Sequence, residues 1–242
     1  MTKQPGPDCR FVLVATSHSG NLGAAARAML TMRLEQLVLV APACTLDAQA
    51  RAMAASAERV LDAASHHARL ADALADTTLC LGLTARPRRD GVPALTPRQA
   101  AAMLTREPGP AALLFGRERT GLSNDELSHC HRLVHIPANP DYPALNLAAA
   151  VQIMAYEIFI AASSARPAAP AARVAEDRAA AASGAHLEGL HRELERLADA
   201  SAAPARAPRE VLHRRLRNFI NRARPSVDEV DLLRGILKHR HR

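Results

Sequence analysis

Three polar segments carry the residues of this chain that could do chemistry. Residues 17–27 read SHSGNLGAAAR, residues 114–123 read LFGRERTGLS, and residues 136–147 read IPANPDYPALNL. Each one follows a short apolar run, which places it at the carboxyl end of a predicted strand. Open α/β sheets tend to bind ligands at that end of their strands. The three segments are therefore candidate ligand-binding loops.

The first segment has the features of an anion site at the start of a helix. Asn21 is a plausible helix N-cap, the small residues after it permit close approach, and Arg27 lies two turns into the helix. Such a site would hold a phosphate. The spacing alone favours a simple strand-to-helix turn with a surface arginine, because a lone G-x-x-G is weak support for a binding site.

The other two segments also have a simpler interpretation. In the second, two arginines flank Glu118 between two glycines, so Glu118 could fix one guanidinium while the other contacts phosphate. A salt-bridged turn would have the same sequence. In the third, prolines and asparagines surround Tyr142 and predict a rigid loop that exposes backbone groups, which suits a flat cofactor. Taken alone, this segment is an ordinary loop.

The elements that would position these segments form an α/β pattern. Short runs rich in Val, Leu and Ile alternate with helical patterns and predict a largely parallel, buried sheet. The expected strands are 11–16, 36–41, 78–84, 111–115 and 133–137, with helices near 22–32, 47–58, 68–75, 97–106 and a long one at 145–163. We assign this domain to residues 1–164.

A second module is predicted after an Ala/Pro-rich linker at 165–184. Leucines at helical spacing from Leu187 to Leu197 indicate one helix of a module that spans 185–242. Ser226 followed by Glu229 is a capping-box signal for its last helix. We expect five arginines on exposed surfaces of this module: Arg214, Arg215, Arg217, Arg222 and Arg224.

Charge is distributed unevenly along the 242 residues. The formal net charge is +7, yet residues 1–205 carry 20 Lys+Arg against 20 Asp+Glu, whereas residues 206–242 carry 11 against 4. This clustering predicts a tail that binds a polyanion, although such a surface is usually just a solvated face. The scarcity of aromatic residues argues against a protein that stacks single-stranded bases on aromatic platforms.

The cysteines and apolar runs narrow the class of protein further. The four cysteines are scattered and form no C-x-x-C pair, and the cluster His129, Cys130 and His131 has a spacing that suits no zinc site. We therefore expect no metal and no disulfide framework. The longest apolar stretches are too short to span a bilayer, and the N-terminus lacks a signal-peptide layout. A cytoplasmic protein without a membrane partner is expected.

Together, the three segments resemble the signature motifs of the SpoU branch of the SPOUT superfamily of RNA methyltransferases. The phrases SHSGNLGAAARAM, FGRERTGLSNDEL and ANPDYPALNLA carry the resemblance, and it is closest to the TrmJ type of tRNA ribose 2′-O-methyltransferases. The tail phrase RRLRNFINRARPSVDEVDLLRGIL resembles the same type. The resemblance covers nearly the whole chain except the linker and the first ten residues.

The resemblance implies a fold, a cofactor and a substrate. It implies a sheet whose C-terminal segment threads into a deep trefoil knot, and a homodimer to whose interface the long helix contributes. It also implies S-adenosylmethionine as methyl donor and tRNA as substrate, methylated at the cytidine or uridine of position 32 in the anticodon loop. The implied cofactor-binding residues are Leu83, Thr84, Ala85, Gly116, Ile136, Ala144, Leu145 and Asn146.

The resemblance also assigns catalytic roles. Arg27 would orient the ribose and stabilise the developing oxyanion, because a guanidinium is a poor base. Asn21, Glu118 and Tyr142 would position Arg27 and the substrate. The expected RNA-binding residues are Arg117 and Arg119 together with the five tail arginines. One departure is Ala144, which stands where related sequences often have serine, so a hydroxyl contact there is in doubt.

Three other functions are weighed against this one. The first is a SpoU-type enzyme that acts on ribosomal RNA or on another tRNA position, and the Arg-rich tail phrase disfavours it. The second is a non-catalytic RNA-binding protein that keeps the knot, which the intact Arg27, Asn21 and Glu118 disfavour. The third is a nucleotide-binding oxidoreductase, which we set aside because no G-x-G-x-x-G follows the first strand.

Overall fold

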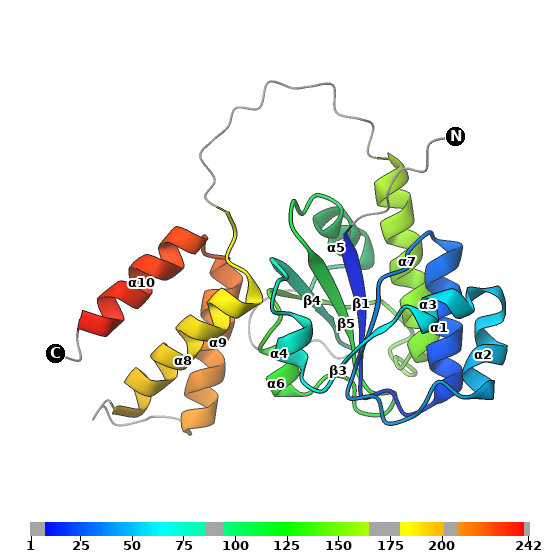
Figure 1. The fold of residues 1–242 in the computed structure, drawn as a ribbon, viewed down its shortest axis with the longest axis horizontal. Coiled ribbons are helices and arrows are strands. Elements are labelled where there is room, and N and C mark those ends of the chain that lie inside the picture. The colour runs from blue at the N-terminus through cyan, green and yellow to red at the C-terminus, as the bar shows by residue number, and fades with distance from the viewer. Residues whose placement is uncertain (1–7, 86–93, 165–179, 201–207, 240–242) are drawn as a thin grey trace.

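Six parallel strands form one sheet, in the order β3-β2-β1-β5-β4-β6 (Figure 1). The structure is a computed structural model that describes residues 8–85, 94–164, 180–200 and 208–239. The strands are β1 Cys9–Val14, β2 Leu37–Val40, β3 Ser65–His67, β4 Leu79–Leu83, β5 Ala111–Phe115 and β6 Arg132–Val134. Around them lie α1 Ser19–Thr31, α2 Ala48–Ala54, η1 Ala55–Ala57, α3 Glu58–Asp62, α4 Leu70–Ala73, α5 Pro97–Leu104, α6 Asn124–Leu127 and α7 Leu147–Ser164. The predicted α/β class with a parallel sheet is confirmed.

The central strands are apolar along their whole length because helices cover both faces of the sheet. Side chains alternate along β1, so Phe11 and Leu13 pack with α1, α5 and α7, while Val12 and Val14 pack with α4 and α6. The rings of Phe11 and Phe115 stack with their centroids 5.5 Å apart. This packing fixes β1 beside β5 and so brings the loops after these two strands together.

Several predicted elements differ from the observed ones. The edge strand β3 was not predicted, since its sequence SHH is polar and has no apolar pattern to indicate a strand. The helix predicted at 47–58 is broken into α2, η1 and α3, because Ala55 has a φ of 50°. Helix α1 begins at Ser19 and its N-cap is His18, so the prediction that Asn21 is the N-cap is wrong.

Helix α1 packs very closely on α2. A Cβ added at Gly23 would lie 2.0 Å from the carbonyl oxygen of Ala50, so no larger residue fits there without moving the backbone. This close approach explains the glycine in the first polar segment by helix packing.

Helix α7 is the long helix predicted at 145–163. It has a mean hydropathy of 1.5 over 18 residues, which by length and composition is enough to cross a membrane. Core helices pass the same test, and α7 packs against α1 and α5 with Val151, Met154, Ala155 and Ile158 buried. We therefore assign α7 to the core of the domain.

The C-terminal module consists of α8 Gly184–Ala200, α9 Arg209–Ala223 and α10 Val227–His239. Its small core contains Ala182, Leu187, Leu190, Ile220 and Val230. The predicted capping box is confirmed: the Ser226 backbone N–H donates to Glu229 Oε2 at 2.8 Å, and the Glu229 N–H donates to Ser226 Oγ at 3.3 Å. Helices α9 and α10 also keep large apolar side chains exposed, namely Phe219, Leu232 and Ile236.

The end of the predicted linker belongs to this module. Residues 165–179 lie outside the described residues, but Ala182 is buried in the module core and Ala181 forms a β-bridge with Ser226. The predicted boundary at 184/185 therefore falls inside a packed segment.

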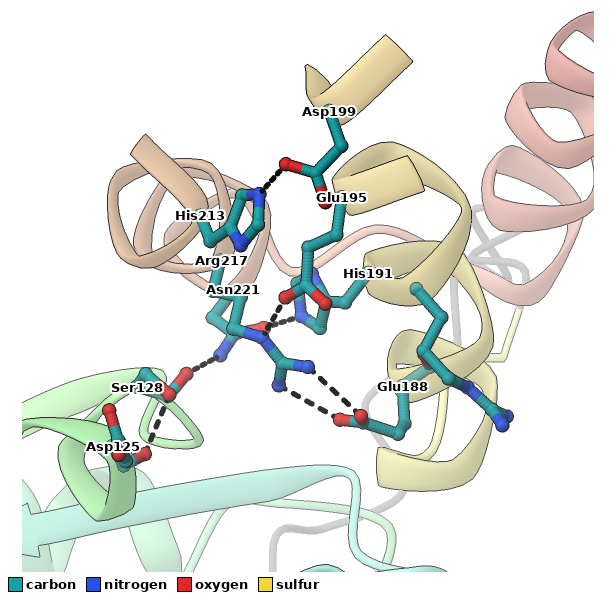
Figure 2. A network of polar contacts seen from close by, with 10 residues as sticks. Asp125, Ser128, Glu188, His191, Glu195, Asp199, His213, Arg217 and Asn221 are labelled. Atoms are coloured by element: carbon teal, nitrogen blue, oxygen red, sulfur yellow. Dashed lines mark hydrogen bonds and ion pairs between the residues drawn. The ribbon is translucent and has the colours of Figure 1, made fainter. Parts of the chain in front are cut away.

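The module lies beside α4 and α6 of the body (Figure 1). Asn221 joins the two parts at Ser128, which ends α6 (Figure 2). Its side-chain amide donates to the Ser128 carbonyl at 2.6 Å, and its Oδ1 lies 3.0 Å from His191 Nε2. The backbone N–H of Gly184 donates to the Thr77 carbonyl at 2.9 Å. Arg224 adds an ion pair to Glu107 of the body at 2.8 Å. The module is thus attached to the body through buried polar contacts.

Candidate active site

A cavity of about 680 Å³ lies among the loops that follow β4, β5 and β6 and the first turns of α7. Its size is within the range of small-molecule sites. Seven of the eight predicted cofactor residues line it: Leu83, Thr84, Ala85, Gly116, Ile136, Ala144 and Leu145. The structure thus brings together residues that are far apart in the sequence.

The loop after β5 is compact because Gly116 is a glycine. A Cβ at Gly116 would lie 2.2 Å from the backbone nitrogen of Leu122, where the loop folds back on itself. Glu126 accepts two hydrogen bonds from Arg117 Nη1, both at 3.0 Å, and also caps α6 through the Ser123 N–H at 2.7 Å. Arg117 is thus fixed by Glu126 and not by Glu118, so the salt bridge of this loop forms within the segment that leads into α6.

Glu118 instead joins Asn21 and Asn146 in a polar cluster beside the cavity. Asn21 Nδ2 donates to Glu118 Oε1 at 2.9 Å, and Asn146 Nδ2 donates to Asn21 Oδ1 at 3.0 Å. Asn146 Oδ1 accepts from the Ala148 N–H at 2.9 Å, so Asn146 caps α7 and does not line the cavity. One residue from each of the three polar segments therefore meets in this cluster.

Glu118 is held as a carboxylate. Besides Asn21, it accepts from the Ser17 N–H at 3.3 Å, the Ser17 hydroxyl at 2.9 Å and the His18 N–H at 3.3 Å. Burial raises the pKa of Glu118, but the hydrogen bonds from Asn21 and Ser17 outweigh it and lower this pKa to about 2. The cluster is therefore a fixed negative charge at the edge of the cavity.

Ser17 and His18 also belong to this cluster, although neither is among the residues predicted for the site. Ser17 Oγ lies 3.0 Å from His18 Nδ1, and Nδ1 lies 3.5 Å from Glu118 Oε1. The chain reaches them through Ala15, whose φ of 50° is left-handed and costs an alanine about 1 kcal/mol. Their position inside the first polar segment was the only signal in the sequence.

The comparison with known families agrees with this geometry. The family model described as SpoU rRNA Methylase family matches residues 8–156.

The chain belongs to the SpoU methylase family.

Its tail and its relatives place this SpoU chain in the TrmJ branch. The model of the tRNA methyltransferase TrmJ C-terminal domain matches residues 186–242. The chain is 44% identical over 230 residues to the tRNA (cytidine/uridine-2′-O-)-methyltransferase TrmJ of Yersinia enterocolitica. The aligned region covers 94% of this chain and 89% of the Yersinia protein. It is 42% identical over 240 residues to the corresponding protein of Pectobacterium atrosepticum, with 94% of both chains covered. The predicted family is confirmed.

Solved structures of the family share the architecture. TrmJ from Z. mobilis ZM4 superposes with a TM-score of 0.83 at 31% identity, covering 96% of this chain and 99% of that one. A probable methyltransferase from Bordetella pertussis Tohama I is 43% identical with a TM-score of 0.61, covering 64% of this chain and 96% of that one. The SpoU methyltransferase AviRb from Streptomyces viridochromogenes shares the fold, with a TM-score of 0.51 at 20% identity. That superposition covers 64% of this chain and 60% of AviRb.

Two of the predicted catalytic residues of this SpoU domain stand apart from the cluster. Arg27 is exposed on α1 and forms no hydrogen bond or ion pair with any described residue. The Tyr142 side chain is 78% exposed, at the end of a turn closed by its own N–H and the Asn139 carbonyl at 3.0 Å. Their catalytic roles stay predictions.

The arginines of the TrmJ-type C-terminal domain fall into two groups. Arg217 is largely buried between Glu188, which it contacts through two hydrogen bonds of 2.9 Å, and Glu195 at 2.7 Å (Figure 2). Arg224 is held by Glu107. The prediction that all five arginines are exposed is wrong for these two, because carboxylates of the protein already neutralise them. Arg215 and Arg222 are exposed, and Arg214 is half-buried.

His129, Cys130 and His131 lie where the body meets the C-terminal module. His131 Nδ1 accepts the Cys80 N–H at 2.9 Å, and burial, helped by Arg224, lowers the pKa of His131 to about 4. Within the described ranges, no three His, Cys, Asp or Glu side chains gather as a metal site would require. This cluster of the SpoU domain supports packing between the body and the tail.

Proposed function

We propose that this chain transfers the methyl group of S-adenosylmethionine to the ribose 2′-hydroxyl of a cytidine or uridine in tRNA, at position 32. The observation that carries the proposal is the position of Glu118. It lines the cavity that seven predicted cofactor residues surround, and it also anchors the polar cluster with Asn21. The proposed cavity for the methyl donor therefore lies next to a fixed polar cluster, which we assign to the ribose that accepts the methyl group.

The cavity suits the proposed methyl donor. It is lined by residues of three loops, among them the apolar residues Leu83, Ile136 and Leu145, which suits a flat adenosine group. When bound, S-adenosylmethionine supplies an electrophilic methyl group on a sulfonium. The protein must then hold the ribose hydroxyl in line with that methyl group, and we assign the orientation of ribose and phosphate to Arg27.

The substrate class is supported by the named relatives and by the charge of the tail. The relatives in Yersinia and Pectobacterium are tRNA (cytidine/uridine-2′-O-)-methyltransferases. Arg119 at the cavity and Arg215 and Arg222 on the tail are exposed cations, as contacts to the phosphates of an RNA require. Because tRNA is the proposed substrate, we propose a cytoplasmic location, and the four free cysteines agree with a reducing compartment.

The proposed enzyme is a homodimer with a knotted sheet. Tyr156 and Ile160 on α7 are large apolar side chains that remain 50% and 37% exposed, and a second copy packed on α7 would cover them. Sedimentation should show twice the mass of one chain, and Ile160→Glu should lower it to one. The trefoil knot is proposed from the family, and the three loops around one cavity support it.

The experiment is methylation of unmodified tRNA transcripts with S-adenosylmethionine, followed by mapping of ribose methylation at each nucleotide. Wild type and Arg27→Ala are run side by side. Methylation at position 32 that is lost in the variant is expected. Methylation at another position, or of ribosomal RNA, would overturn the assignment of position 32, and failure with every RNA would favour a binding protein without activity.

A further inference from the structure

The proposed reaction releases a proton from the ribose 2′-hydroxyl, and most ionisable side chains of the site cannot accept it. Arg27 and Arg119 are guanidiniums, which stay protonated in proteins. Glu118 is a very weak base, because its pKa is about 2 and its oxygens already accept from Asn21, Ser17 and His18. The imidazole of His18 remains, and histidine is the side chain most often used for this task.

The hydrogen bonds around Ser17 fix which nitrogen of His18 carries the proton. A hydroxyl has one proton, and the Ser17 hydroxyl donates it to the Glu118 carboxylate at 2.9 Å, since a carboxylate can only accept. Ser17 Oγ therefore accepts from His18 Nδ1, which lies 3.0 Å away. With the proton on Nδ1, a neutral His18 has its free lone pair on Nε2.

His18 is also placed to reach a substrate. Its side chain is 71% exposed, whereas Glu118 behind it is 14% exposed. Among the described residues, none bonds to Nε2, and the backbone of His18 is tied to Glu118, which lines the cavity. The carboxylate 3.5 Å from Nδ1 would stabilise an imidazolium once it forms.

We propose that His18 Nε2 is the general base of the methyl transfer, a role that rests on the proposed function. The ribose oxygen forms a bond to the methyl carbon as the carbon–sulfur bond breaks, and the electron pair of that bond stays on sulfur. The electron pair of the O–H bond stays on the ribose oxygen, and the proton passes to Nε2. The imidazolium then gives this proton to water.

His18→Gln tests the proposal, because it removes the basic ring nitrogen and keeps a polar side chain. We expect kcat on tRNA to fall about 100-fold or more, while the Kd of S-adenosylhomocysteine and the KM for tRNA stay as in wild type. Free imidazole should restore part of the rate of His18→Gly. The control is His66→Gln, the same change at an exposed position on β3.

A second readout does not depend on activity. In nitrogen-15 spectra of the histidine rings at neutral pH, His18 should show the proton on Nδ1, and Glu118→Gln should change that signal. An Nε2–H form of His18, or a His18→Gln enzyme with unchanged kcat, would overturn the proposal. Wild-type enzyme inactive on every RNA would instead refute the proposed function itself.

Discussion

Asn21 and Glu118 are 97 residues apart in the chain, yet Asn21 Nδ2 donates to Glu118 Oε1 at 2.9 Å. Their strands explain the contact. β1 and β5 are parallel neighbours, with Leu13 opposite Phe115, so the segments that follow both strands leave the sheet at the same edge. The pairing of two buried strands thus places a helix amide against a loop carboxylate, and the cluster depends on both oxygens of that carboxylate.

Glu118→Gln should therefore impair methyl transfer without unfolding the chain. The glutamine amide offers one acceptor oxygen where the carboxylate offers two, so part of the contacts to Ser17, His18 and Asn21 is lost. A charge-assisted hydrogen bond contributes about 1.5 kcal/mol. If its loss raises the activation free energy of methyl transfer by that amount, the rate of methyl transfer falls about tenfold. Initial rates on tRNA and the Tm check this. Glu58→Gln, on the exposed surface of α3, should change neither, and equal rates for the two variants would refute the assignment.

Asn221→Ala should loosen the C-terminal module. It would leave the Ser128 carbonyl and His191 Nε2 without their partner in a buried position, at a cost of about 2 kcal/mol or more in the free energy of unfolding. Urea unfolding measures this free energy. The matched control is Asn218→Ala, because Asn218 is exposed and lies one turn earlier on the same helix. Similar losses for both variants would contradict the role of Asn221.

Acidification should destabilise the junction between the body and the tail. Burial lowers the pKa of both His131 and His191 to about 4, whereas a histidine of the unfolded chain titrates near 6.5. Between these pH values the unfolded state binds more protons, so the free energy of unfolding has its full value above about pH 6.5 and falls as the pH approaches about 4.

Unfolding curves from pH 7 to pH 4 measure this dependence. His191→Gln keeps a side-chain amide that can donate to Asn221 but cannot titrate, so its stability should fall less steeply with pH. A slope equal to that of wild type would show that His191 does not contribute.

Two arginines of α9 should give opposite phenotypes. Arg215→Ala removes an exposed cation, so it should weaken tRNA binding and reduce the salt dependence of binding by about one phosphate contact, with an unchanged Tm. Arg217→Ala should lower the stability by about 2 kcal/mol, because Glu188 and Glu195 lose their partner. Filter binding at several salt concentrations and thermal unfolding distinguish them. Loss of tRNA affinity by Arg217→Ala at unchanged Tm would reverse this assignment.

The apolar pattern of the sequence predicted the parallel sheet, and the resemblance to the SpoU branch predicted most residues of the cavity. The apolar runs of β1 and β5 are buried on both faces, and such runs are readable from the sequence. The loop residues Leu83 and Ile136 were carried over from motifs and line one cavity in the structure.

What the sequence could not predict are the long-range partners of charged side chains. Nothing near Arg217 in the sequence shows that Glu188, 29 residues away, neutralises it, so it looked like part of a basic surface. The same holds for Arg117, which Glu126 binds from the next helix. His18 was missed because its importance depends on the hydrogen bond between Ser17 and Glu118, 101 residues apart.

The most direct test of ribose methylation at position 32 removes only the 2′-oxygen that would accept the methyl group. A tRNA that carries a single 2′-deoxynucleotide at position 32 is compared with the all-ribose tRNA, using labelled S-adenosylmethionine and the wild-type enzyme. We predict that the deoxy tRNA binds with similar affinity and receives no methyl group. Methyl incorporation into the deoxy tRNA at the rate of the all-ribose tRNA would contradict methylation of the ribose at position 32.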